Sequence, residues 1–177
     1  KFTDVTASNV GSWAADSIDF CADNDLVNGK STYSFAPKDN LTRGQLVAIL
    51  YRAAGSPSVT GTTNPFNDVK TGDYYYNAVL WAYKNDVVNG TGAGKFSPNA
   101  NVTREQIAAI LYRYMGSPAA TGSLSGYTDR SKISSWATTA MQWAIGKGYI
   151  TGTSSTTLDP LGQATRRSEE RRVGKEC

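Results

Sequence analysis

One short pattern occurs three times in this chain, and its regular spacing constrains the possible folds more than any other feature. Each copy runs from a glycine through a Phe-x-Pro or Leu-x-Pro step to a Thr-Arg pair. The three glycines, Gly29, Gly90 and Gly152, lie 61 and then 62 residues apart. Fixed-period similarity means that the repeat is the structural unit. A unit of about sixty residues is marginally stable alone, so we expect three units that pack on one another.

Two helices are predicted in each complete copy. Apolar residues spaced three and four apart predict amphipathic first helices. Their expected ranges are 12–24, 74–85 and 135–147. A second helix is predicted to begin at Thr42 and at Thr103, because Gln follows each Thr three residues later, as in a capping box. Both second helices are expected to end at Gly-Ser-Pro. The fold class is therefore mainly α, with at most a two-residue strand pairing near each loop.

The repeats divide the chain into three units and a tail. The expected units are residues 1–56, 64–117 and 125–167, joined by short linkers rich in Gly, Ser and Thr. The third copy stops matching after Thr165-Arg166, and residues 168–177 carry three of the four Glu of the chain. Two origins fit this segment. We favour a non-native tail that replaces the genuine helix over a natural charged cap.

The composition argues against several classes of protein. Charged residues make up 19% of the chain and the net charge is +3, which does not predict nucleic-acid binding. No apolar run reaches the length of about eighteen residues that predicts a membrane span. Abundant Ser, Thr, Asn, Gly and Tyr are more typical of an extracellular protein. The start at Lys1, inside a repeat and without Met, indicates that the natural N-terminus has been removed.

Catalysis is not predicted. The chain has no His, which leaves no Ser-His-Asp or Cys-His arrangement and no His-based metal site. Glu105 is the only Glu before the tail, and a glycosidase needs two facing carboxylates. We therefore expect no catalytic residue, no metal site and no cofactor.

Structural roles are predicted for several repeated residues. The aspartates of the aromatic-x-Asp step that opens each repeat either cap a helix or tie down a turn; they are Asp4, Asp68 and Asp129. The aromatic residues at the centre of the first helices are expected in the core; they are Phe20, Trp81 and Trp143. Cys21 is expected to be a small buried side chain.

The arginine of the Thr-Arg pair in each copy is the main candidate for binding. Arg43, Arg104 and Arg166 stand in the first turn of a helix, where the helix dipole favours anions over cations. Free backbone N–H groups and a guanidinium together form an anion site, and Arg can hold a carboxylate through two parallel bonds. The alternative is an Arg that folds back onto an Asp or a loop carbonyl. For a binding role we expect accessible side chains.

Two further sets of residues accompany the arginines. Trp13, Tyr74 and Trp136, near the starts of the first helices, either form a groove wall for the face of a sugar or pack internally. The repeat glycines either adopt positive φ or leave room for a ligand beside the backbone. The sequence leaves both pairs of alternatives open.

With these motifs, residues 1 to about 167 resemble a triplet of S-layer homology domains. Leu41-Thr42-Arg43-Gly44-Gln45 and Val102-Thr103-Arg104-Glu105-Gln106 are similar to the Thr-Arg-Ala-Glu-like signature of that family, and the third copy keeps only Thr165-Arg166. The resemblance implies helix-loop-helix repeats in a pseudo-threefold, three-pronged arrangement with a central helical bundle.

The resemblance also implies a function. It is the non-covalent anchoring of a secreted protein at the cell surface, through a secondary cell-wall polysaccharide that carries ketal-linked pyruvate. The polymer would lie in grooves between repeats, and the signature arginines would be its main contacts. The alternative is a structural module that self-assembles with other surface-layer subunits without binding glycan directly.

Replacing residues 168–177 with a copy of residues 45–54 is expected to raise the melting temperature by roughly 5 °C or more, because it supplies an apolar stripe that the tail lacks. Thermal unfolding followed by circular dichroism measures this change. An unchanged melting temperature would show that a third apolar helix is dispensable.

Overall fold

The structure is a computed structural model, and it describes residues 2–167. Its regular elements, in chain order, are α1 (Ala7–Val10), α2 (Ser12–Asp23), α3 (Arg43–Ala53), α4 (Tyr76–Lys84), α5 (Arg104–Tyr114), the 3-10 turns η1 (Arg130–Lys132) and η2 (Ser135–Ala137), and α6 (Thr138–Gly146). The described part of the chain is thus mainly α-helical, and its β structure consists of isolated bridges. The tail, 168–177, lies outside the described residues.

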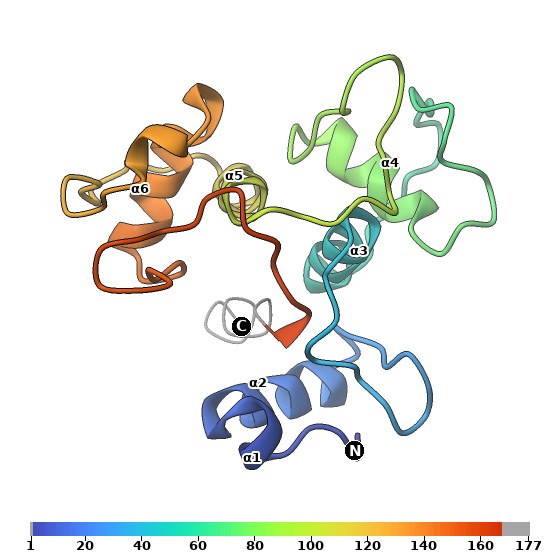
Figure 1. The fold of residues 1–177 in the computed structure, drawn as a ribbon. Coiled ribbons are helices and arrows are strands. Elements are labelled where there is room, and N and C mark those ends of the chain that lie inside the picture. Colours follow the sequence, from blue (N-terminus) through green and yellow to red (C-terminus); the bar gives the residue numbers. More distant parts are fainter. Residues whose placement is uncertain (1, 168–177) are drawn as a thin grey trace.

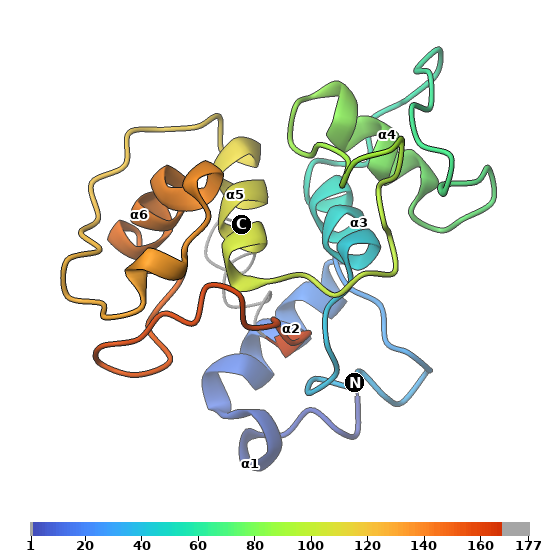
Figure 2. The same cartoon turned by 45° about the horizontal axis from the view of Figure 1, so that its top comes forward.

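Three lobes surround the middle of the molecule (Figure 1). One contains α1 and α2, one contains α4 and one contains α6, while α3 and α5 lie toward the middle in both views (Figure 2). The second helix of one repeat packs on the first helix of the next, because α3 contacts α4 and α5 contacts α6. Adjacent repeats therefore share a hydrophobic interface.

Equivalent aromatic pairs fill these two interfaces. The rings of Tyr51 and Trp81 have centroids 5.7 Å apart, and those of Tyr112 and Trp143 have centroids 5.6 Å apart. Trp81 is 8% exposed and Trp143 is 2% exposed, so both are core residues as predicted. The same prediction was wrong for Phe20, which is 41% exposed.

The predicted helix boundaries are largely confirmed. Thr42 and Thr103 are N-caps with complete capping boxes, in which each Thr side chain accepts from the backbone N–H of the Gln and each Gln side chain accepts from the backbone N–H of the Thr. Gly55 and Gly116 follow the two helices with φ of 81° and 78°, as a glycine stop requires. The range predicted at 135–147 is divided between η2 and α6, and α1 was not predicted.

A closed cycle of backbone hydrogen bonds joins the three repeats. The residue before each Thr-Arg pair takes part: Leu41 N–H donates to Ala164 C=O (2.8 Å), Ala164 N–H to Val102 C=O (3.0 Å), and Val102 N–H to Leu41 C=O (2.9 Å). These pairings confirm the short strand contact expected near the loops. Since each repeat gives one donor and one acceptor to different neighbours, the cycle requires all three repeats.

The opening aspartates tie down the Phe-x-Pro loops rather than capping helices. In the first repeat, the Asp4 carboxylate accepts from the N–H groups of Phe35 and Ala36, both at 2.8 Å. Asp68 and Asp129 make the equivalent pairs of bonds in their own repeats. The middle residue of each loop is not glycine and has a φ of 50–57°. The carboxylate therefore stabilises a strained turn by accepting hydrogen bonds from two backbone N–H groups of that turn.

Positive φ, one of the two alternatives for the repeat glycines, is wrong, because none of the three has φ in that region. A Cβ atom on Gly29, Gly90 or Gly152 would lie 2.4, 2.6 or 2.2 Å from a carbonyl oxygen of its own loop. An aromatic ring from the start of the same repeat is also close to each position. Close backbone approach excludes a side chain there. Cys21 is fully buried, as predicted.

Asp68 is expected to make stability depend on pH. Burial raises the pKa of its carboxyl group, but the hydrogen bonds from Phe96 and Ser97 outweigh this effect and lower the pKa below its usual value. Stabilisation is therefore fully present above the unfolded pKa of about 3.9 and is lost as the pH falls through the native value. We expect Asp68→Asn to cost about 1 kcal/mol at pH 7, after discounting for solvent screening.

Urea unfolding of both proteins between pH 7 and pH 2 measures this dependence. The difference between wild type and Asp68→Asn should shrink as the pH falls below about 4, because the carboxyl group then binds a proton in the unfolded state and, at lower pH, in the native state. A difference that stays constant across that range would contradict the proposed role of the charge.

Two grooves between repeats as the candidate site

Each signature arginine reaches into the loop of another repeat. Arg43 Nε donates to Phe96 C=O (2.9 Å) and its Nη2 donates to Asn89 C=O (3.1 Å). The guanidinium carbon lies 4.7 Å from the centroid of the Phe96 ring, which adds a cation–π contact. An arginine at the start of α3 thereby holds the Gly-to-Pro loop of the second repeat.

The other two arginines repeat these contacts and close a ring. Arg166 donates to Phe35 C=O and Asn28 C=O, both at 2.8 Å, and lies over the Phe35 ring. Arg104 donates to Leu158 C=O (2.8 Å) and Thr151 C=O (2.5 Å). The first repeat thus holds the second, the second holds the third, and the third holds the first. The interpretation of an Arg that folds onto loop carbonyls is confirmed.

The expectation of accessible arginines was wrong for two of the three. Arg43 and Arg166 are each 6% exposed, and Arg104 is half-buried. Burial lowers the pKa of Arg43, and the nearby charge of Arg113 adds to this effect while Asp68 opposes it. Arginine remains charged at neutral pH. The sequence could not reveal the burial, since the covering loop comes from another repeat.

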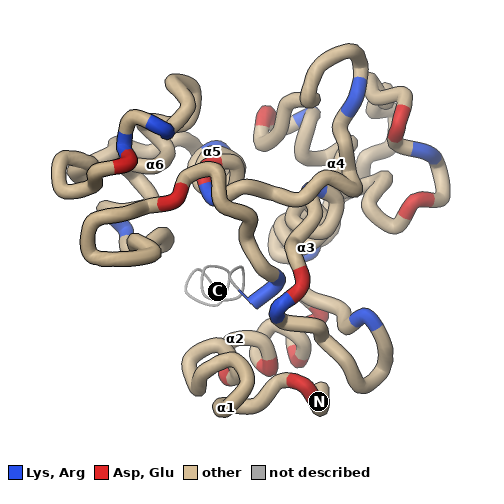
Figure 3. Tube along the Cα trace, viewed as in Figure 1, with Lys and Arg blue, Asp and Glu red and all other residues tan. Residues whose placement is uncertain are grey.

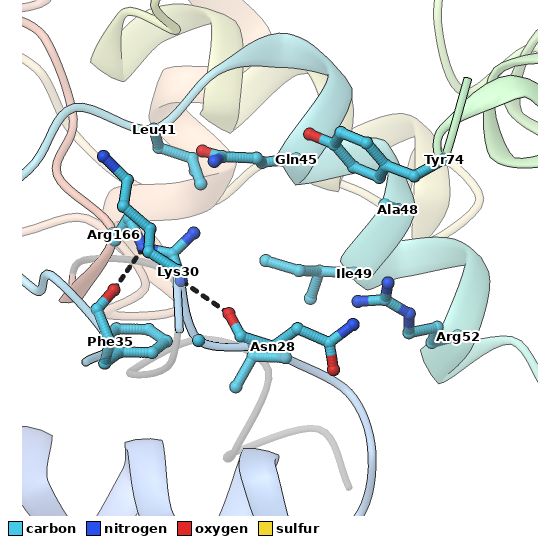
Figure 4. A pocket seen from close by; sticks show the side chains of 12 residues that line it. Asn28, Lys30, Phe35, Leu41, Gln45, Ala48, Ile49, Arg52, Tyr74 and Arg166 are labelled. Carbon is cyan, nitrogen blue, oxygen red and sulfur yellow. Dashed lines mark hydrogen bonds between the residues drawn. The ribbon is translucent and has the colours of Figure 1, made fainter. Parts of the chain in front are cut away.

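A groove of about 300 Å³ lies beside Arg166, and we call it the Tyr74 groove. All three repeats contribute: Arg166 comes from the third, the loop from Val27 to Lys30 from the first, and Tyr74 from the second. Figure 4 shows the side chains of Gln45, Ala48, Ile49 and Arg52 arrayed along α3 on one side of it. The arginine bonds to Phe35 and Asn28 form its opposite side.

A second groove, of about 460 Å³, lies beside Arg43, and we call it the Trp136 groove. Its lining repeats that of the Tyr74 groove at equivalent positions: Asn89, Gly90, Gln106, Ala109, Ile110, Arg113 and Trp136. Arg43 stands where Arg166 stands in the other groove. Two sites with the same construction therefore occur between successive repeats.

Both grooves are cationic. Among residues 2–167, no Asp or Glu lines either groove, while the Trp136 groove has Arg43 and Arg113 and the Tyr74 groove has Arg166, Arg52 and Lys30. Lys30 pairs with Asp39, so the two arginines are what the grooves share. Acidic and basic residues are otherwise scattered over all three lobes (Figure 3). In the described part of the chain, basic residues without acidic neighbours in the lining are therefore a feature of the two grooves and not of the lobes in general.

Each groove also has an exposed aromatic side chain on its wall. Tyr74 is 63% exposed and Trp136 is 53% exposed, and each lines its groove. Burial raises the pKa of Tyr74, against the effect of its contact with Thr42 and of the charges of Arg166 and Arg52. Trp13 is also exposed, at 45%. Its groove would need the helix after Arg166, and residues 168–177 lie outside the described part.

Two groove residues near the ends of the second helices were not predicted from the sequence. Arg52 and Arg113 stand in the last turns of α3 and α5 and line the two grooves. The signal was present, because both follow a Tyr and are 61 residues apart. Among the repeat glycines, Gly29 and Gly90 line the grooves. The space beside them is occupied by their own loops.

Comparison with known proteins matches this construction to one family. A profile of the S-layer homology domain matches residues 1–47, 65–108 and 126–167. This chain belongs to the S-layer homology domain family. The three matches coincide with the three repeats that the arginines and the backbone cycle connect. Family membership indicates an association with the cell surface.

Relatives carry this module within much longer proteins. The chain is 31% identical to an amylopullulanase of Thermoanaerobacterium thermosulfurigenes, over 87% of the chain and 8% of that protein. It is 27% identical to a surface-layer 125 kDa protein of Lysinibacillus sphaericus, over 90% of the chain and 14% of that protein. A cellulosome-anchoring protein of Acetivibrio thermocellus is 24% identical, over 75% of the chain and 31% of that protein.

These proportions separate the module from the activities of the relatives. The S-layer homology repeats of this chain span a small part of each relative, including those named as enzymes. Within residues 2–167, no helix is long and apolar enough to cross a bilayer. The same range holds no cluster of three side chains suited to binding a metal ion.

Arg43→Ala is expected to lower the free energy of unfolding by about 2 kcal/mol or more, because it removes two charge-assisted hydrogen bonds and a cation–π contact between repeats. Arg43→Lys should lose less stability than Arg43→Ala but remain less stable than wild type, since an ammonium group cannot reproduce the planar arrangement of guanidinium N–H donors. Urea denaturation measures both variants. Lys38→Ala, an exposed cation in a neighbouring loop, is the control and should change stability by less than about 0.5 kcal/mol. A stable Arg43→Ala protein would contradict the structural role.

Proposed function

We propose that this chain anchors a secreted protein to the bacterial cell wall without a covalent bond, by binding an anionic wall polysaccharide in the grooves between its repeats. The ligand we propose is a secondary cell-wall polysaccharide with pyruvate ketals. The observation that carries the proposal is the pair of equivalent grooves, each with two guanidinium groups and an aromatic wall.

The chemistry of the lining favours a carboxylated sugar. Nε and Nη2 of Arg43 donate to loop carbonyl groups, and Arg113 adds a second cation to the groove. A carboxylate between two cations forms charge-assisted bonds worth about 1.5–3 kcal/mol each. Trp136 or Tyr74 offers a face for the apolar side of a sugar ring. A volume of 300–460 Å³ is within the usual range for small-ligand sites.

The proposal includes the arrangement of the units. We propose that residues 1–56, 64–117 and 125–167 are the repeats, and that they surround a pseudo-threefold axis with one helix each in a central bundle. The cyclic bonds of Leu41, Val102 and Ala164 and the cyclic reach of the three arginines support this arrangement. A third groove, with Arg104, Gly152 and Trp13, would be its consequence. Several grooves on one chain would increase the avidity for a repetitive polymer.

Replacing both aromatic walls, Tyr74→Ala with Trp136→Ala, is expected to weaken binding to wall sacculi at least tenfold with little change in melting temperature. Both rings are more than half exposed, so they contribute to the grooves more than to the core. Co-sedimentation with purified sacculi gives the affinity. The matched control is Tyr33→Ala, since Tyr33 is 67% exposed and lines neither groove.

The nature of the ligand is tested with the same assay. Removing pyruvate from the sacculi should reduce binding by the wild-type protein to the level of the double variant. Equal binding to intact and stripped sacculi would overturn the anionic ligand.

The second candidate is a surface-layer module that assembles with other subunits and does not bind glycan. The relative named as a surface-layer protein favours it. Sedimentation velocity without wall polymer distinguishes the two functions. Concentration-dependent assembly that persists in the Tyr74→Ala, Trp136→Ala variant, together with no binding to sacculi, would replace the first proposal with this one.

A further inference from the structure

A third hollow adjoins the Tyr74 groove. It has a volume of about 410 Å³ and lies where α3 meets the loop and helix of the second repeat. It shares Ala48, Arg52 and Tyr74 with the Tyr74 groove. In Figure 4 these three residues lie together at one end of that groove. The two hollows are thus neighbours, and Tyr74 and Arg52 form their common border.

The lining of this hollow differs in charge from the groove. Asp73 lines it, whereas no carboxylate of the described part of the chain lines the Tyr74 groove. Asp73 is held in place because its Oδ2 accepts from the backbone N–H of Lys70 at 2.7 Å. Asn77 and Thr71 add an amide and a hydroxyl, and Tyr76 adds an aromatic ring. These groups can donate to and accept from hydroxyl groups, while Asp73 would repel a second anion.

From this juxtaposition we infer that the hollow is a second subsite, which takes a neutral sugar unit next to the anionic unit in the Tyr74 groove. The inference rests on the proposed function, because it assumes that the groove takes the charged unit. The guanidinium of Arg52 and the ring of Tyr74 contact both units from the border. The chain therefore recognises a disaccharide of defined charge pattern, with one anionic unit followed by one neutral unit.

The corresponding region of the third repeat has a different chemistry. The positions equivalent to Thr71, Asp73 and Asn77 are Ile133, Ser135 and Thr139, so the carboxylate and the amide are missing there. Ser134, in this segment, is occupied with the Glu105 carboxylate, to which both its N–H and its hydroxyl donate. The extended subsite therefore belongs to the Tyr74 groove, and the two grooves differ in how much of the polymer they recognise.

The test compares two probes by calorimetry on the whole chain. One is a ketal-pyruvylated monosaccharide, and the other is the disaccharide in which a neutral sugar is linked to it. Both probes are titrated into the Trp136→Ala variant, in which binding to the Trp136 groove is weakened, so that the measured affinity is that of the Tyr74 groove. The disaccharide is expected to bind about tenfold more tightly than the monosaccharide. Asn77→Ala should weaken the affinity for the disaccharide by roughly threefold to tenfold, as the loss of one hydrogen bond predicts. It should leave the affinity for the monosaccharide unchanged.

Thr139→Ala, the equivalent substitution in the third repeat, is the matched control and should change neither affinity. Equal affinities of the two probes, or an Asn77→Ala variant that weakens both probes alike, would overturn the second subsite while leaving the anionic groove intact. If neither probe binds the parent protein, the anionic groove fails, and the subsite fails with it.

Discussion

The guanidinium groups that cross from one repeat to another are the interaction on which the rest of this structure depends. Each of the three donates two hydrogen bonds to carbonyl oxygens of a loop that its own repeat does not contain. The same loops are shaped from within by an aspartate that accepts from two N–H groups. A loop held from both sides can keep non-glycine residues at positive φ, and it presents fixed carbonyl groups at the edge of a groove.

This arrangement explains why the grooves are shared between repeats. Since each arginine leaves the start of a helix and ends in another repeat, the space beside it is bounded by two repeats from the outset. The segment that leads into the first helix of a neighbouring repeat then adds an exposed aromatic ring, because Tyr74 precedes α4 and Trp136 lies in η2. Stability and binding are consequently linked through the same side chain. Loss of the arginine disturbs the loop as well as the charge of the site, and so the aromatic walls are the cleaner probe of binding.

The helical elements followed from local rules. The capping boxes at Thr42 and Thr103 and the glycine stops at Gly55 and Gly116 depend on residues within a few positions of each other, and the structure has them where the sequence predicts them. Trp81 and Trp143 are buried as their periodicity predicts. Phe20 has the same local pattern and is exposed, whereas Trp81 and Trp143 pack against Tyr51 and Tyr112 of another repeat, a contact that the local pattern does not show. The repeat glycines show the same limit, since close contacts with their own loops, rather than φ, exclude a side chain.

The sequence by itself determined the number of repeats, the helix starts and the identity of the signature arginines, because these depend on spacing and on contacts within one turn. Only the tertiary structure decided what the arginines bond to, that Arg43 and Arg166 are buried, and that Arg52 and Arg113 join them at the grooves. Those facts depend on partners that are 46 to 138 residues away in the sequence, Asn89 and Phe96 for Arg43 and Asn28 and Phe35 for Arg166. Periodic spacing shows that a residue recurs but not which repeat it contacts, and that contact exists only once the three repeats have packed together.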